Sequence, residues 1–187
     1  MVDFMTCDDF VGSPLGDQLF KIASTAGLAY KLGGQPIFPD WEGQGAFNVP
    51  DEFFTTLVPA ECDIIDFNGP FDPSDFSEIM YDVCEWFTPS DAIQGRVESE
   101  YPEFFKGGHH TAIHSSQSLP AEYYERRVNE VLAGRPDTQF IVFSEMTQLT
   151  PVHFILSLLC DSHITSETSF SWWSNFLSDA FAVLEEK

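Results

Sequence analysis

Basic residues are scarce in this chain, which has 8 Lys and Arg against 30 Asp and Glu among 187 residues and a formal net charge of −22. A protein that binds a nucleic-acid backbone needs clustered Lys and Arg to neutralise phosphates. The composition therefore argues against direct binding of a nucleic-acid backbone. Twenty of the acids lie within residues 1–105, where the basic residues are Lys21, Lys31 and Arg96. The negative charge is concentrated in the first part of the chain.

Three interpretations of this acidity stay open. It forms a solvated surface that keeps the protein soluble, it is an adaptation to high salt, or it mimics DNA toward a DNA-binding partner. The 19 phenylalanines suit a large ordinary core and argue against salt adaptation. A solvated surface, with room for a basic protein partner on the acidic half, is the interpretation we favour.

Long apolar runs and paired cysteines are also missing. No stretch of about 18 uninterrupted apolar residues occurs, and residues 1–5 lack the basic flank and apolar core of a signal peptide. We therefore expect a soluble, cytoplasmic protein without a membrane span. The cysteines at positions 7, 62, 84 and 160 form no Cys-x-x-Cys pair and have no His at zinc-ligand spacing. We expect reduced, mostly buried thiols, with neither a structural metal nor a disulfide framework.

The first part of the chain contains a βαβ pattern. Residues 2–7 predict a strand, and residues 17–32 predict a helix that ends at Gly33-Gly34 and is followed by a strand at 35–39. The predicted buried face of the helix consists of Leu19, Ile22, Ala23, Ala26 and Tyr30. This order favours a parallel sheet. Between residues 40 and 105 the pattern weakens: residues 62–67 are the best strand candidate, and the aromatic pairs 53–54, 86–87 and 104–105 are predicted core anchors.

The last part of the chain has a clear alternating pattern. Strands are predicted at 111–114, 138–143 and 163–165, and helices at 120–133, 152–160 and 171–185. The predicted apolar face of the first of these helices consists of Tyr124, Val128, Val131 and Leu132, and that of the last includes Trp173, Phe176 and Leu177. The unbroken apolar run at 138–143 is typical of a buried parallel strand. We predict an α/β fold with Rossmann-like parallel sheets, divided near Lys106-Gly107-Gly108 into a reduced half, residues 1–105, and a compact Rossmann-like half, residues 106–187.

In an open parallel sheet, ligands bind beyond the carboxyl ends of the strands. Four segments are predicted to arrive there: the turn at 15–18, the loop after His114, Ser144-Glu145, and the turn at 167–171. In the last of these, helix N–H groups and the hydroxyls of Thr168, Ser169 and Ser171 suit a diphosphate. The alternative is that these hydroxyls only cap the helix.

Several motifs in the right order resemble the alpha-1,2-fucosyltransferases of glycosyltransferase family 11. The opening is Pro14-Leu15-Gly16-Asp17-Gln18-Leu19-Phe20, which resembles the family's Gly-x-Leu-Gly-Asn-Gln-Leu-Phe. The terminal signature of the family, Asn-Ser-Ser-Phe-Ser-Trp-Trp, is matched by Glu167-Thr168-Ser169-Phe170-Ser171-Trp172-Trp173. The matching motifs lie near both ends of the chain, at residues 14–20 and 167–173.

The resemblance implies a reduced GT-B-type architecture in which the second half binds a nucleotide-sugar donor, GDP-fucose in the family, and the first half faces the acceptor. It implies transfer of the sugar to a hydroxyl acceptor without a metal or other cofactor. The implied donor-binding residues are Gly16, Gln18, Ser144, Thr168, Ser169, Phe170 and Ser171. The candidate catalytic residues are His114, as phosphate ligand or general base, and the carboxylates of Asp17 and Glu145. The alternative for His114 is a hydrogen-bonded histidine in a loop.

One family motif is changed in this sequence. The His-x-Arg-Arg-Gly-Asp motif falls at Ile113-His114-Ser115-Ser116-Gln117, which has no arginine to hold a diphosphate. Either Arg126 or Arg127 replaces the missing arginines, or both face solvent. The sequence therefore predicts a glycosyltransferase related to alpha-1,2-fucosyltransferases. The alternative is a catalytically lapsed, acidic binding protein that captures a nucleotide-like ligand or binds a basic partner in the manner of a DNA mimic. The shortness and acidity of the chain suit a streamlined or virus-encoded version of the fold.

Overall fold

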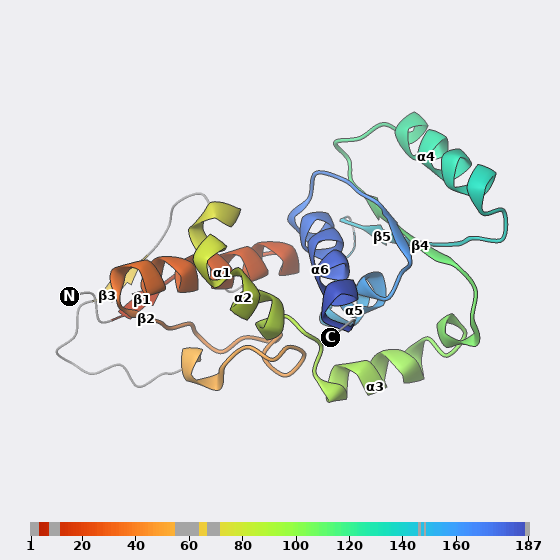
Figure 1. Ribbon diagram of the computed structural model, residues 1–187. Helices are drawn as coiled ribbons and strands as arrows, with labels where there is room; N and C mark the ends of the chain where they lie inside the picture. The colour runs from red at the N-terminus through yellow and green to blue at the C-terminus, as the bar shows by residue number, and fades with distance from the viewer. Residues whose placement is uncertain are drawn as a thin grey trace. The chain divides into compact units, whose positions relative to one another are not determined.

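The computed structural model describes residues 4–7, 12–54, 64–66, 72–145, 147 and 149–185. It contains two three-stranded parallel sheets with helices around them (Figure 1). This confirms the predicted α/β class with Rossmann-like parallel sheets. The chain divides into two compact units, residues 1–90 and 91–187. This division precedes the predicted one at residues 105–106, because helix α3 (Asp91–Glu100) packs with α5 (Pro151–Leu158) of the later unit.

The first unit is built on the predicted βαβ pattern. Strand β1 (Phe4–Thr6) is central and pairs in parallel with β2 (Gln35–Pro36) and β3 (Ile64–Asp66). Helix α1 (Leu15–Leu32) connects β1 to β2, and it ends at Gly33 as predicted, with Gly33 at φ 72°. A left-handed residue of this kind closes helices because glycine has no Cβ to clash there.

The buried face of α1 differs from the predicted face at one position. Leu19, Ile22, Ala23 and Ala26 are buried as predicted, whereas Tyr30 is 61% exposed. Ala29 is fully buried in place of Tyr30. An alanine lets the helix approach its neighbours closely, while the phenol of Tyr30 remains in solvent at the end of the helix.

Helix α1 also packs closely against a short helix that the sequence did not predict. This 3₁₀ helix, η3 (Pro73–Ile79), is followed directly by α2 (Met80–Trp86). Phe76 of η3 is fully buried and lies 6.3 Å from the ring of Phe20. At the contact, α1 has Gly27, and a Cβ there would lie 2.6 Å from the Cα of Phe76 and even closer to the carbonyl oxygen of Asp75. The absence of a side chain at Gly27 permits this approach.

Aromatic side chains fill the rest of the first unit. Trp41 stacks on Phe47, with ring centroids 5.6 Å apart, and Phe53 meets Trp86 edge to face at 5.1 Å. Phe53 belongs to the short helix η2 (Asp51–Phe53). Of the predicted core anchors, Phe53 and Phe87 are buried, whereas Phe54, Trp86 and Phe104 are half-buried. Phe105, in η4 (Phe104–Lys106) of the second unit, is an exception because it is 46% exposed.

The second unit has the predicted β-α-β-α-β-α order. Strand β4 (His110–Ser115) is central, between β5 (Gln139–Ser144) and β6 (Ser162–Ile164). Both pairings are parallel, with Ser115 opposite Ser144 and Ile113 opposite Ile164. The three strands therefore end at one edge of the sheet, which we call the carboxyl edge. Helix α4 (Ala121–Gly134) follows β4, α5 follows β5, and α6 (Ser169–Glu185) follows β6.

Strand β5 was predicted to be buried, and this prediction is wrong. Phe143 is its only buried residue, and Val142 is 61% exposed. The reason is topological: β5 is an edge strand of a three-stranded sheet. Helix α4 has no buried residue, and its predicted apolar face is only half-buried. The face consists of Tyr124, Val128, Val131 and Leu132.

The core of the second unit lies between α5, α6 and the sheet. Phe154 and Ile155 of α5 and Trp173 and Leu177 of α6 are all fully buried. The hydroxyls of Ser157 and Ser174 lie 2.8 Å apart inside this contact. A hydrogen bond between two buried hydroxyls satisfies both of them and fixes the register of the helices. None of the helices within the described ranges has the length and apolarity to cross a membrane.

The cysteines of the described ranges agree with the prediction of buried thiols. Cys7, Cys84 and Cys160 are buried and take part in no disulfide among the described residues. Burial, together with the nearby Asp161, raises the pKa of Cys160 to about 12, and burial also raises the pKa of Cys84. These thiols are therefore not activated nucleophiles. Cys62 lies outside the described residues.

Candidate functional site

The loops at the carboxyl edge of the second sheet are joined by hydrogen bonds. The Glu145 N–H donates to the Ser115 carbonyl at 3.1 Å, and the Glu145 carboxylate accepts from the Gln117 N–H. The Ser116 N–H donates to the Tyr124 hydroxyl at 3.0 Å. The predicted site residues Ser144 and Glu145 therefore lie beside the loop that follows β4, and Glu145 holds that loop in place.

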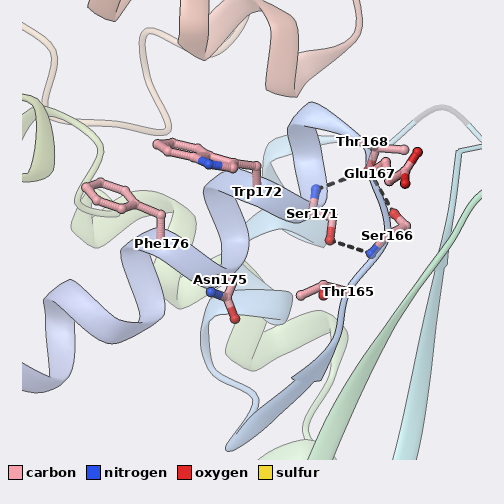
Figure 2. A pocket seen from close by; sticks show the side chains of 8 residues that line it. All are labelled: Thr165, Ser166, Glu167, Thr168, Ser171, Trp172, Asn175 and Phe176. Carbon is pink, nitrogen blue, oxygen red and sulfur yellow. Dashed lines mark hydrogen bonds between the residues drawn. The ribbon is translucent and has the colours of Figure 1, made fainter. Parts of the chain in front are cut away.

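A pocket of about 660 Å³ lies at the start of α6, and we call it the α6 pocket (Figure 2). Its polar wall is formed by Thr165, Ser166, Glu167, Thr168, Ser171 and Asn175. Its apolar wall is formed by Trp172 and Phe176. Counted from Thr168, the lining positions of the helix are 168, 171, 172, 175 and 176, which share one helix face. This spacing is the sequence signal that could have identified Trp172, Asn175 and Phe176 as lining residues. We predicted Phe176 to be on the buried face, whereas it is half-buried and lines the pocket.

The hydroxyls at the start of α6 bond mainly to one another and to the backbone. The Ser171 N–H donates to Thr168 Oγ1 at 3.2 Å, and the Ser166 N–H donates to Ser171 Oγ at 2.9 Å. The hydroxyls of Ser166 and Thr168 are 3.1 Å apart. Figure 2 shows the three side chains linked in this way. The cap at Thr168 explains why α6 begins at Ser169, two residues before the predicted start.

Replacing Thr168 with alanine is expected to lower the free energy of unfolding by about 1 kcal/mol, because the Ser171 N–H loses its acceptor. Thr168→Ser keeps the acceptor and is expected to lose less than half of that amount. Urea unfolding at constant pH measures both. Equal stability of Thr168→Ala and the unsubstituted chain would contradict the capping role.

The four predicted donor-binding residues of α6 divide into two pairs. Thr168 and Ser171 line the pocket. Phe170 is buried and packs edge to face on Phe154 with centroids 5.3 Å apart, while Ser169 is partly exposed at the first helical position. The side chain of Phe170 is therefore a core residue in this structure.

His114 lies inside the sheet's core and is 1% exposed. Its Nε2 is 3.0 Å from His163 Nδ1, and His163 Nε2 is 3.1 Å from the Ser178 hydroxyl. Since that hydroxyl donates to the Ser174 carbonyl at 2.7 Å, it accepts from His163 Nε2–H, and His163 Nδ1 accepts from His114 Nε2–H. His114 Nδ1 has no hydrogen-bond partner within the described residues.

Burial lowers the pKa of His114 to about 3, and the neighbouring His163 contributes to the shift. The imidazole is therefore neutral at physiological pH. Phe143 and Phe170 also contact its ring, at centroid distances of 5.7 Å. In this structure His114 is a hydrogen-bonded histidine, as the alternative interpretation predicts, but it lies in strand β4 and not in a loop.

The remaining predicted site residues lie in the first unit. Gly16 is buried and Asp17 half-buried in the first turn of α1. Gln18 Nε2 donates to the Ser13 carbonyl at 2.7 Å, and Gln18 Oε1 accepts from Trp41 Nε1 at 2.6 Å. Gln18 thus connects the loop before α1 to Trp41.

The arginines considered as replacements for the missing motif lie on the surface of α4. Arg127 pairs with Glu130 at 2.6 Å, and Arg126 lies 4.0 Å from the same carboxylate. Both side chains are about half exposed or more, as the solvent-facing interpretation predicts.

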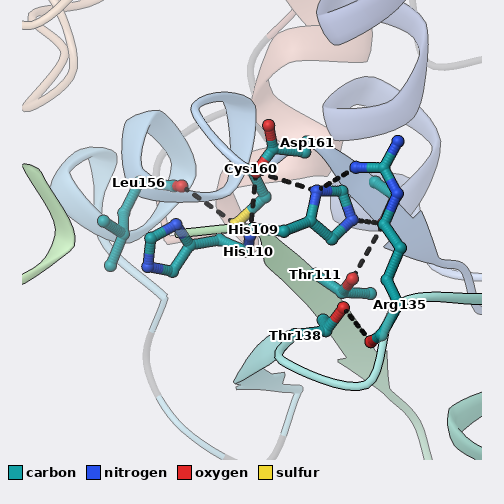
Figure 3. Close-up of polar contacts among 9 residues, drawn as sticks. His109, His110, Thr111, Arg135, Thr138, Leu156, Cys160 and Asp161 are labelled. Carbon is teal, nitrogen blue, oxygen red and sulfur yellow. Dashed lines mark hydrogen bonds and ion pairs between the residues drawn. The ribbon is translucent and has the colours of Figure 1, made fainter. Parts of the chain in front are cut away.

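Arg135 belongs to a polar cluster at the amino end of β4 (Figure 3). Its Nη1 lies 2.7 Å from His109 Nδ1, and Asp161 Oδ2 accepts from the His110 N–H at 2.8 Å. Strand β4 runs from this cluster to the carboxyl edge. None of the residues that line the α6 pocket is positively charged. In the described part of the chain, no three His, Cys, Asp or Glu side chains gather as potential metal ligands.

The sequence matches no protein-family model and no curated protein. The structure is similar to fucosyltransferase NodZ from Bradyrhizobium, with a TM-score of 0.63 and 13% identity over 95% of this chain and 93% of NodZ. A NodZ alpha-1,6-fucosyltransferase co-crystallised with GDP gives a TM-score of 0.60 at 13% identity, over the same shares of both chains. One soaked with GDP-fucose gives 0.51 at 14%, again over 95% and 93%. The chain therefore has a fucosyltransferase-like fold of the GT-B type.

Proposed function

We propose that this chain is a glycosyltransferase that moves a sugar from a nucleotide-sugar donor to a hydroxyl acceptor. The observation that carries the proposal is the likeness in fold, over 95% of the chain, to a fucosyltransferase whose solved structures include GDP and GDP-fucose. We propose a GDP-sugar as donor for the same reason. The motifs at both ends of the sequence favour the alpha-1,2 family, whereas the similar solved structures are of an alpha-1,6 enzyme. Linkage analysis of the product distinguishes the two.

The geometry of the second unit supports a donor site at the carboxyl edge. Ser144, the start of α6 and the loop after β4 lie at the ends of neighbouring parallel strands, where ligands of open α/β sheets bind. We propose that Ser144, Thr168, Ser169 and Ser171 hold the donor, with the backbone at Phe170. Gly16 and Gln18 remain our proposal for the contribution of the first unit.

Among the candidate bases, Glu145 has the most suitable surroundings. It is exposed at the carboxyl edge, and its position is fixed by the Gln117 N–H and the Ser115 carbonyl. A general base must reach the proton of the acceptor hydroxyl, and Glu145 is accessible for that contact. Asp17 remains the second candidate. His114 would reach a substrate only if the core around it opened.

The test of the proposed function is calorimetric titration with GDP, UDP and their sugars, followed by an assay of donor hydrolysis and transfer. We expect GDP to bind in preference to UDP, and Glu145→Gln to lower turnover about 100-fold or more at unchanged thermal stability. Because we propose a reaction without a metal, EDTA is expected to leave turnover unchanged. Glu130→Gln on α4 is the matched control and is expected to retain full activity. Absence of GDP binding at millimolar concentration would overturn the proposal.

The acidity of the first unit favours a second candidate function, that of an acidic binding protein. Residues 1–90 contain 16 acidic residues and two basic ones, Lys21 and Lys31. Lys21 is buried against the Ser13 hydroxyl at 2.9 Å, and Lys31 donates to the Ser74 carbonyl at 3.0 Å. This candidate would be supported if the folded chain shows no nucleotide binding in the titration but binds a basic protein with an affinity that falls as the salt concentration rises.

A further inference from the structure

We propose that Lys21 and Trp41 are positioning residues, which hold the loop before α1 in one conformation for a substrate that binds to the first unit. Neither residue is among the predicted site residues, and both act on the loop through hydrogen bonds. The structure describes residues 12–14 of this loop, and α1 follows directly. The effect on a reaction rests on the proposed function, whereas the effect on the loop does not.

The loop lies where a ligand of the first sheet is expected. Strand β1 ends at Thr6 and β2 ends at Pro36, and the two strands are parallel. The loop follows β1 and Trp41 follows β2, so both lie beyond the carboxyl ends of these strands. Open parallel sheets bind their ligands in that region. The first turn of α1, which the loop leads into, contains Gly16, one of the residues that we propose for donor binding.

Two side chains of α1 hold Ser13 of the loop. Lys21 Nζ donates to Ser13 Oγ at 2.9 Å, and Gln18 Nε2 donates to the Ser13 carbonyl at 2.7 Å. Ser13 is therefore fixed through both its side chain and its backbone. The preceding residue, Gly12, has φ 88°, a conformation that residues with a side chain rarely adopt. These contacts give the loop a defined path at the start of α1.

Trp41 determines which way the amide of Gln18 faces. Trp41 Nε1 donates to Gln18 Oε1 at 2.6 Å, and an indole N–H can only donate, so the amide nitrogen of Gln18 is directed to the Ser13 carbonyl. The indole itself has little freedom to move. It stacks on Phe47 with the planes inclined by 6°, and a Cβ at Gly43 would overlap its ring. The aromatic core of the first unit is thus connected to the loop through one oriented amide.

The burial of Lys21 indicates a role other than stability. Lys21 is buried on α1 beside the fully buried Ile22. Burial of an ammonium group removes its hydration, and apolar residues at buried positions are often at least as stabilising as charged ones. An apolar side chain would pack here but would not donate to Ser13. The hydrogen bond to the loop is what the lysine supplies.

A network of this kind is expected to affect binding more than chemistry. If the loop has its binding conformation for only a fraction of the time, the apparent dissociation constant of the substrate rises by the inverse of that fraction. Saturating substrate restores the conformation, so the turnover at saturation changes little. A positioning role therefore predicts a higher KM at nearly constant kcat, whereas partial unfolding lowers kcat by reducing the amount of active protein.

The first experiment is hydrogen exchange of the full chain without ligand, measured by mass spectrometry. Lys21→Met and Trp41→Phe each remove one donor and keep an apolar side chain in its place. We expect both to accelerate exchange within residues 12–18 about fivefold or more and to leave exchange within residues 73–86 unchanged. Lys31→Met is the matched control on the same helix, because Lys31 donates to the Ser74 carbonyl and not to the loop. Unchanged exchange within residues 12–18 in Lys21→Met and Trp41→Phe would overturn the proposal.

The second experiment is donor hydrolysis with GDP-fucose as the probe. We expect Lys21→Met and Ser13→Ala to raise the KM about fivefold or more while kcat stays within about twofold. Ser13→Thr keeps the hydroxyl and is expected to retain the original KM. A lower kcat at constant KM would also overturn the positioning role. If the unsubstituted chain hydrolyses no donor, the proposed function fails, and the exchange experiment alone decides whether Lys21 and Trp41 hold the loop.

Discussion

Acidification from pH 7 to pH 4 is expected to destabilise the second unit through a single buried residue, His114. The pKa of this imidazole is about 3 in the folded chain, against an ordinary value of 6.5. Between these two values the unfolded chain holds a proton on His114 that the folded chain does not. The free energy of unfolding therefore falls as the pH falls below 6.5, and this contribution levels off below about 3.

The expected effect is large because each pH unit in this window is worth about 1.36 kcal/mol. The complete shift corresponds to about 4 to 5 kcal/mol, which is a substantial part of the stability of an ordinary domain. The structural cause is that a charged ring at this position would be desolvated beside His163 and the rings of Phe143 and Phe170. Urea unfolding at half-unit intervals of pH measures the slope.

The control for this effect is His114→Gln, whose amide still donates to His163 Nδ1 but does not titrate. This variant is expected to be less stable at pH 7, because it packs less well, and to lose less stability on acidification than the unsubstituted chain. If His114→Gln has the same pH dependence as the unsubstituted chain, His114 is not the group responsible.

Gly27→Ala is expected to destabilise the first unit by about 3 kcal/mol, the upper end of the usual cost of adding a methyl group to a closely packed contact. The added methyl group would meet the backbone of η3, 2.6 Å from the Cα of Phe76. Backbone atoms cannot move aside as a flexible side chain can, so α1 and η3 must separate. Thermal unfolding and urea unfolding measure the loss.

Gly95→Ala provides the matched control because Gly95 is exposed in helix α3, with open space where the methyl group would be placed. There the substitution is expected to stabilise the chain by up to about 1 kcal/mol through helix propensity. Opposite signs at these two helical glycines are the expected result. Stabilisation at both positions would show that α1 and η3 are not in the close contact described.

The regular elements of this fold could be predicted because their local signals agree with their tertiary positions. Gly33 ends α1, and the alternation of strands and helices after residue 110 gives the second sheet. The segment η3–α2 was missed because short helices have little periodicity and depend on burial of residues such as Phe76. Strand β5 was assigned to the interior because an apolar run does not reveal how many strands a sheet has.

The candidate site was predicted less well than the fold. The sequence located the start of α6, but it did not distinguish Phe170, which is in the core, from Trp172, which lines the pocket. The two differ by a rotation around the helix axis that only the packed structure fixes. The surroundings of His114 could not be predicted from the sequence either. His163 and Ser178 are far from His114 in sequence, and the sheet and α6 bring them together only in the folded chain.

The edge of β5 that is unpaired in the described part of the chain could pair with another copy of the chain, and the negative charge of the chain acts against such association. Within the described residues β5 pairs with β4 alone, so its other side presents peptide groups and the exposed Val142 to any neighbouring copy. Such an edge is a template for growth of a sheet from one molecule to the next. Mutual repulsion between copies that each carry a net charge of −22 opposes that encounter. The scarcity of Lys and Arg therefore opposes pairing between two copies at this edge.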